Sequence, residues 1–129
     1  MGTGWPQWAL VMAGGALGAA GRFWLGGHLL RQFGDRLPWG TLIANLIGAF
    51  AIGFLAEWLQ ERGQAALYWR AFLIVGVLGA LTTYSSVMLE LLLFTRGGRI
   101  GTAALYLGIT LVGGMALIWA GARLGALLR

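Results

Sequence analysis

The chain has 129 residues, of which 59% are hydrophobic and only 10% are charged, and its mean hydropathy is +0.79. An ordinary soluble domain carries about 25% charged residues, so this composition excludes a water-soluble globular fold. Every basic residue is an arginine and these arginines form no stripe, which argues against nucleic-acid binding. With no cysteine, disulfides and thiolate metal sites are excluded. The composition predicts one transmembrane domain over residues 1–129.

Four apolar segments are long enough to cross a hydrocarbon core of about 30 Å, which takes roughly 20 helical residues. They are predicted, in chain order, at about 8–30, 39–58, 71–94 and 100–124. Short polar connections are expected at 31–38, 61–70 and 95–99. We therefore predict an all-α membrane protein with four transmembrane helices per chain.

The first span holds one charged residue, Arg22. Its side chain is expected either to reach the interface or bond to carbonyls, or to act as a fixed positive charge that attracts an anion near a pore mouth. Gly14 and Gly18 form a GxxxG step in the same span, and Gly121 and Gly125 form another in the fourth. Small residues at this spacing predict close helix packing.

The second span contains a single amide, Asn45, in an otherwise apolar helix. The amide offers two donors and one carbonyl acceptor, which fits either a hydrogen bond between helices or a polar binding site. Glu90 in the third span is identified as the acid within the spans. Two roles are open for Glu90: it pairs with an arginine, or it ends a track of polar side chains.

The third span has four threonines and serines within five positions, and Gly76 and Gly79 precede them closely. This pattern predicts a helix that is broken at mid-membrane, because glycines weaken the helix and hydroxyls bond to freed backbone. Carbonyls at such a break suit cations, whereas N–H groups and hydroxyls suit anions. The chain shows no nucleophile with a base, paired carboxylates or metal-ligand cluster, so passage of a small ion is favoured over catalysis.

Arginines near the span ends are balanced between the two membrane sides expected for four spans. One side carries Arg62, Arg70, Arg123 and Arg129, and the other carries Arg31, Arg36, Arg96 and Arg99. The excess of arginine that marks cytoplasmic loops is absent, so neither orientation is preferred. The hypothesis that follows is an antiparallel, dual-topology dimer with a two-fold axis in the membrane plane.

Three segments, in order, resemble the motifs of a known family. Residues 14–22 (GGALGAAGR) resemble GGxxGAxxR, residues 38–48 (PWGTLIANLIG) resemble PxGTLxxNxxG, and residues 76–86 (GVLGALTTYSS) resemble GxxGGxTTFSTF. On these motifs the chain is identified as a member of the Fluc (CrcB) family of bacterial fluoride channels, and the resemblance covers its whole length.

The resemblance implies a channel that exports cytoplasmic fluoride passively and lowers its toxicity. It also implies an antiparallel homodimer in the bacterial inner membrane with two fluoride paths. Residues matching the family's path are Arg22, Thr41, Asn45, Tyr84, Ser86, Val87, Glu90 and Thr110. The backbone carbonyls of Gly79 and Thr82 match those that hold a central structural sodium ion, contributed by both subunits.

Two positions depart from the family pattern. Tyr84 replaces the first pore phenylalanine, which keeps a ring edge and adds a hydroxyl, and Val87 replaces the second, which removes the ring edge. The alternatives are a divergent homomeric channel, a heteromeric subunit and a non-conducting one. A small multidrug-type cation exporter would need an acid in the first span, where this chain has Arg22.

Overall fold

The computed structural model describes residues 4–129, and residues 1–3 of the predicted domain lie outside that range. The described part is helical, without strands. Its elements are α1 (Trp5–Phe33), α2 (Trp39–Trp58), α3 (Gln64–Trp69), the π-helical segment η1 (Arg70–Leu78), α4 (Gly79–Leu81), α5 (Tyr84–Arg96), α6 (Ile100–Gly108), the π-helical segment η2 (Ile109–Gly113) and α7 (Gly114–Leu128).

Four helical runs are long and apolar enough to cross a membrane: Trp5–Phe33, Trp39–Trp58, Gln64–Arg96 and Ile100–Leu128. This finding confirms the prediction of a multi-pass, all-helical protein. The first, third and fourth runs extend beyond the apolar spans predicted from the sequence. They do so because the polar residues that border the apolar segments, such as Arg31 and Arg96, are still good helix formers.

The second connection differs from its prediction. Residues 61–70 were expected to form a polar loop, but Gln64–Trp69 is the helix α3. Glutamine, alanine and leucine favour helix whatever their polarity, and α3 starts directly after Gly63, whose φ of +66° suits glycine. Polarity alone therefore misplaced this boundary.

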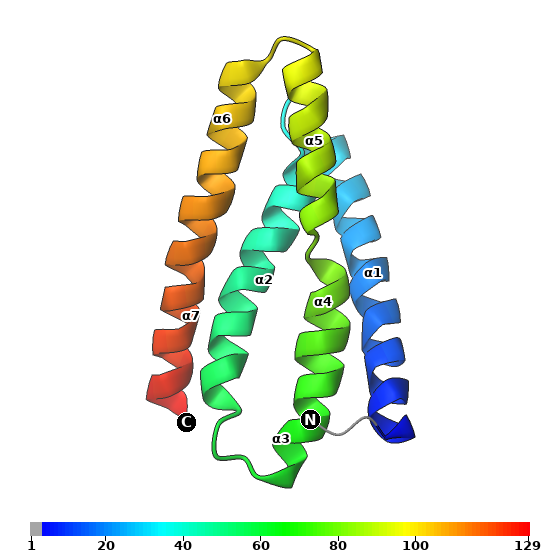
Figure 1. Ribbon diagram of the computed structural model, residues 1–129, viewed down its shortest axis with the longest axis vertical. Helices are drawn as coiled ribbons and strands as arrows, with labels where there is room; N and C mark the ends of the chain where they lie inside the picture. Colours follow the sequence, from blue (N-terminus) through cyan, green and yellow to red (C-terminus); the bar gives the residue numbers. More distant parts are fainter. Residues whose placement is uncertain (1–3) are drawn as a thin grey trace.

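The helices pack mainly as two pairs, α1 along η1 and α4, and α2 along α7 (Figure 1). Glycines allow this close approach. A Cβ added at Gly18 would overlap the carbonyl oxygen of Val77, and one added at Gly121 would overlap that of Phe50. The packing predicted for both GxxxG steps is confirmed.

Gly76 behaves differently from its prediction. It was expected to loosen the helix ahead of the hydroxyl residues, but it packs against α1, where an added Cβ would lie 2.9 Å from the Cα of Gly14. Gly79 is less confined, with the carbonyl oxygen of Ile74 at 3.7 Å from such a Cβ. Close packing thus explains Gly76, while Gly79 stands at the start of the short helix α4.

A compact cluster of buried side chains joins α2, α5 and α6: Leu42, Val87, Phe94, Ala103 and Tyr106. The outer surface is strongly apolar, and Phe23 on α1 is 86% exposed. Such a surface is suited to lipid or to another apolar protein surface. The polar groups described next lie between these packed helices.

Candidate polar pathway

The helical run of the third span is interrupted between α4 and α5. Thr82 (φ −87°, ψ 152°) and Thr83 (φ −152°, ψ 123°) have extended backbones. Figure 1 shows this link near the middle of the molecule's long axis. The Thr82 N–H still donates to the Leu78 carbonyl at 3.0 Å, but the helical hydrogen-bond ladder stops there, so the backbone groups of Thr83 need other partners.

Asn45 on α2 supplies those partners. The backbone N–H of Thr83 donates to Asn45 Oδ1 at 2.8 Å, and Asn45 Nδ2 donates to the Thr83 carbonyl at 3.1 Å. The side chain therefore pairs with Thr83 as a neighbouring β-strand residue would. Of the two interpretations of Asn45, the hydrogen bond between helices is present. One N–H of the amide is left over among the described contacts.

The hydroxyls at the interruption have two roles: one caps a helix, and another bonds to a preceding backbone carbonyl. The Thr83 hydroxyl accepts from the Ser86 N–H at 3.2 Å and so caps the start of α5. It also lies 3.3 Å from both the Ser85 and Ser86 hydroxyls. The Thr82 hydroxyl instead donates to the carbonyl of Leu78, the last residue of η1, at 2.8 Å. Thr82 and Ser86 thus lie on either side of the cap.

Arg22 reaches the same region from α1. Its Nε donates to the carbonyl of Ala80 at 3.2 Å, which is the carbonyl bond that the sequence analysis left open. Arg22 also lines a pocket of about 580 Å³ with Arg31 and Thr41. A fixed positive charge therefore stands close to the interruption.

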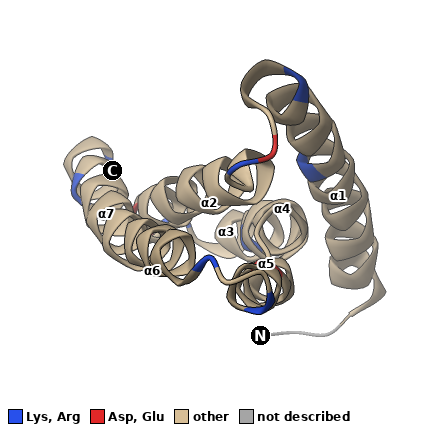
Figure 2. Cartoon of the chain, turned by 90° about the horizontal axis from the view of Figure 1, so that it is seen from above, with Lys and Arg blue, Asp and Glu red and all other residues tan. Residues whose placement is uncertain are grey.

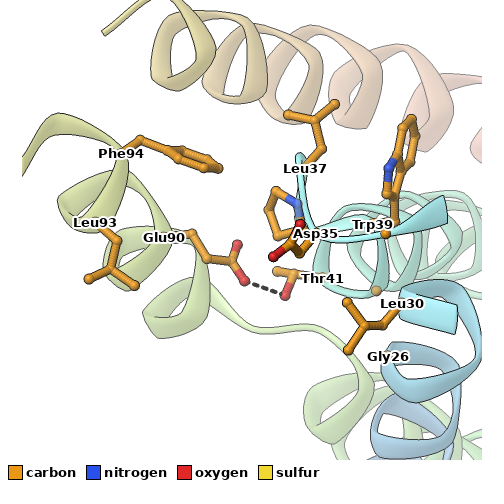
Figure 3. Close-up of a pocket in the computed structure, with 12 residues that line it drawn as sticks. Gly26, Leu30, Asp35, Leu37, Trp39, Thr41, Glu90, Leu93 and Phe94 are labelled. Carbon is orange, nitrogen blue, oxygen red and sulfur yellow. Dashed lines mark hydrogen bonds between the residues drawn. The ribbon is translucent and has the colours of Figure 1, made fainter. Parts of the chain in front are cut away.

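A second polar group centres on Glu90 of α5 (Figure 3). The Thr41 hydroxyl of α2 donates to Glu90 Oε1 at 2.8 Å, and the Tyr106 hydroxyl of α6 donates to Glu90 Oε2. Among the described residues Glu90 makes no ion pair, so the arginine pairing considered for it is not found. Hydroxyls from two neighbouring helices hold this carboxyl group.

Tyr106 was missed by the sequence analysis. Its side chain is fully buried, and its ring meets Phe94 edge-on at 6.0 Å between centroids. A usable signal was present, because Tyr106 and Thr110 are four residues apart and so share one face of the fourth span.

A cavity of about 350 Å³ lies beside Glu90 and Thr41. Its other lining residues come from the end of α1, the α1–α2 connection, the start of α2 and α5, and include Asp35, Trp39 and Phe94. In Figure 3, the side chains of Glu90 and Thr41 point toward each other and are joined directly by their hydrogen bond. The cavity links the Glu90 group to the loop end of the chain.

A smaller cavity of about 300 Å³ lies at the interruption itself, lined by Asn45, Gly79 and Thr82 among others.

The other residues predicted to line the path lie in different surroundings. Tyr84 is 77% exposed, whereas Val87 is 5% exposed and packs in the α2–α5–α6 cluster. The Thr110 hydroxyl in η2 is buried and has no partner among the described residues.

The spans contain a second acid besides Glu90. Glu57 lies in α2, one position before the end of the helix, and pairs with Arg129 at 3.3 Å. The identification of Glu90 as the acid within the spans was therefore incomplete. Its position near the end of α2 separates Glu57 from the polar groups described above.

The structure and its polar groups define a class: a small multi-pass membrane protein with hydrogen-bonding side chains gathered around an interrupted helix. Residues 9–122 match the family model described as CrcB-like protein, Camphor Resistance (CrcB), and the chain belongs to this family.

The relatives include three proteins with the name fluoride-specific ion channel FluC. The one from Xylella fastidiosa (strain 9a5c) is 52% identical over 95% of this chain and 85% of the relative. The one from Xanthomonas axonopodis pv. citri (strain 306) is 50% identical over 94% of this chain and 91% of the relative. The one from Agrobacterium fabrum (strain C58 / ATCC 33970) is 41% identical over 91% of this chain and 94% of the relative.

Proposed function

We propose that the chain forms a fluoride-selective channel through which fluoride leaves the cytoplasm passively, which lowers its toxicity. The observation that carries the proposal is the 52% identity, over 95% of the chain, to a relative named as a fluoride-specific ion channel. The polar groups support it, because a small anion stripped of water needs hydrogen-bond donors along its route. Transport of this kind requires no catalytic group.

The proposed path passes the Asn45 amide and continues along hydroxyls of the third and fourth spans. Asn45 has one N–H left over after its bond to Thr83. Ser86 and Thr110 add hydroxyls, and that of Thr110 is free to donate among the described contacts. Thr41 and Glu90 then extend the polar groups toward the cavity at the loop end.

The two departures from the family pattern have different places in this proposal. Tyr84 is largely exposed, so its ring and hydroxyl are available to face an ion at a contact with a second subunit. Val87 packs within the chain and contributes an apolar wall without a ring edge. A channel completed by a different second subunit is the alternative that this replacement keeps open.

The proposed assembly is an antiparallel homodimer of oppositely inserted chains in the bacterial inner membrane. Two observations support it: the four-against-four balance of arginines at the span ends and the large exposed apolar surface, with Phe23 and Trp24 exposed on α1. Four helices enclose little space by themselves, so two chains provide the walls for a path.

A structural sodium ion is proposed at the centre of this dimer, held by the carbonyls of Gly79 and Thr82 from both subunits. The residues fit such an ion, because the Thr83 N–H bonds to Asn45 and so does not occupy the Gly79 carbonyl. Carbonyl oxygens are suitable ligands for a hard cation. When bound, the ion would supply positive charge that joins the two interrupted helices.

Fluoride efflux from liposomes that contain only this chain tests the proposal, with chloride as the comparison ion. Fast efflux of fluoride and slow efflux of chloride are expected from wild type, and Asn45→Asp is expected to abolish the fluoride signal. No efflux from a monodisperse dimer would reject the homomeric channel and favour a heteromeric or non-conducting subunit.

A further inference from the structure

A pocket of about 460 Å³ lies at the loop end of the chain, next to the cavity beside Glu90, with which it shares Leu37 and Trp39. It is formed where α1 ends and α2 and α6 begin. Its lining residues combine two arginines, a threonine and four apolar side chains: Phe33, Arg36, Leu37, Trp39, Arg99, Thr102 and Leu105. Basic residues lie mainly at the helix ends and connections in the view of Figure 2.

The charge of this pocket is positive and uncompensated. Arg36 and Arg99 line it, and within residues 4–129 the single ion pair joins Glu57 to Arg129 at the other end of α2. Asp35 lines the neighbouring cavity beside Glu90 instead. The pocket therefore presents two guanidinium groups without a carboxylate partner, which suits an anion with several oxygens.

Arg99 is held in place before any ligand arrives. Its Nη2 donates to the Arg36 carbonyl at 2.9 Å, and its guanidinium carbon lies 4.9 Å from the centre of the Phe94 ring. One of its five N–H groups is used in this way, which leaves the others for an anion. Little side-chain freedom is lost on binding, because the guanidinium is already fixed.

Apolar residues continue from the arginines down the helices. Phe33 and Leu105 are 62% and 56% exposed, and the Phe33 ring lies 5.6 Å from that of Trp39. Tryptophan at the start of a membrane span marks the headgroup level. A ligand with a charged head and a long apolar tail matches this arrangement, whereas a free anion would use the arginines alone.

We propose that this pocket binds the phosphate of an anionic phospholipid between Arg36 and Arg99, with the acyl chain against Leu105 and Phe33. Basic pockets between membrane helices are suited to anionic headgroups, and arginine matches phosphate with paired hydrogen bonds. The proposal does not depend on whether the chain conducts fluoride.

Native mass spectrometry of the full chain in detergent, titrated with phosphatidylglycerol or phosphatidylcholine of equal acyl chains, tests this site. Phosphatidylglycerol is expected to bind more tightly. Arg36→Gln is expected to weaken it about fivefold, since each arginine contributes on the order of that factor near a membrane surface. Arg36 is a better target than Arg99, because the bond between them uses only the backbone carbonyl of Arg36. Replacing the Arg36 side chain therefore leaves that bond in place. Arg123→Gln removes the same charge in α7 outside the pocket and is expected to have no effect.

Three outcomes would overturn the proposal. These are equal binding of the two lipids, equal losses in Arg36→Gln and Arg123→Gln, and displacement of the lipid by millimolar inorganic phosphate, which would identify a free-anion site. Arg99→Lys keeps the charge but loses the planar fork and is expected to weaken binding partially. Fluoride efflux of Arg36→Gln in phosphatidylcholine liposomes is expected to match wild type, so the two proposals can fail separately.

Discussion

At the scale of single residues, the Asn45 amide is the contact on which the interruption depends most. It satisfies both backbone groups of Thr83, from a position 38 residues earlier in the chain. A buried backbone group left without a partner costs about 1–3 kcal/mol. Asn45 therefore stabilises the extended link while it keeps a donor for an ion.

Substitution of Asn45 separates these two roles. Asn45→Ala removes both bonds to Thr83 and is expected to lower stability by about 2–4 kcal/mol, because two partly buried groups lose their partners. Asn45→Asp keeps an acceptor for the Thr83 N–H but puts a carboxyl beside the Thr83 carbonyl. It is expected to keep more of the fold and still lose fluoride efflux. Apparent melting temperature and efflux measure the two effects, and an active Asn45→Asp channel would contradict this account.

Tyr106 provides a second test at this scale. Tyr106→Phe keeps the ring that meets Phe94 edge-on and removes the hydroxyl that donates to Glu90. We expect a stability loss of about 1–2 kcal/mol and a clear fall in fluoride efflux, because Glu90 is no longer positioned from α6.

Thr41→Val removes the other donor to Glu90 and serves as the matched comparison. A similar fall in efflux is expected, with a further fall when both changes are combined. Normal efflux from the double variant in a folded dimer would remove the Glu90 group from the path.

At the scale of elements, glycines decide how closely α2 and α7 approach. Gly121→Ala is expected to destabilise the chain by about 1–3 kcal/mol, because the added methyl group would overlap the Phe50 carbonyl oxygen. Gly114 in the same helix has no atom within 4 Å of an added Cβ, so Gly114→Ala is expected to be neutral or slightly stabilising. Thermal unfolding of the solubilised protein checks both, and equal effects would reject this explanation.

The sequence allowed the four helical runs and the packing of Gly18 and Gly121 to be predicted, because apolar length and small-residue spacing are local properties. The hydrogen-bond partners of Asn45 and Glu90 could not be predicted from the sequence. Each is a contact between helices, fixed by how far one helix is rotated and shifted against another. The π-helical segments η1 and η2 alter that rotation, and no residue pattern in the spans indicated them.

At the scale of the whole molecule, the balance of arginines bears on orientation. The chain has no cysteine, so a single cysteine introduced at Gly97 in the α5–α6 turn reports its own side. Labelling of intact cells with a membrane-impermeant reagent is expected to reach about half of the molecules, because neither orientation is favoured.

Added charge is expected to shift this balance. Gln60→Arg with Gln64→Arg places two more arginines on the side of Arg62 and Arg70. Most chains are then expected to place that side in the cytoplasm, and efflux is expected to fall as antiparallel pairs become rare. Labelling of nearly all or nearly none of the Gly97→Cys molecules, without the added arginines, would contradict dual topology.

The bond between Asn45 and Thr83 also has a consequence for how the chain is made. Synthesis runs from the N-terminus, so Asn45 leaves the ribosome before Thr83 does. Lipid offers no hydrogen bonds to an extended backbone, so the third span is poorly suited to enter the bilayer alone. The second span provides a ready partner for it, which makes the two spans a single unit of insertion.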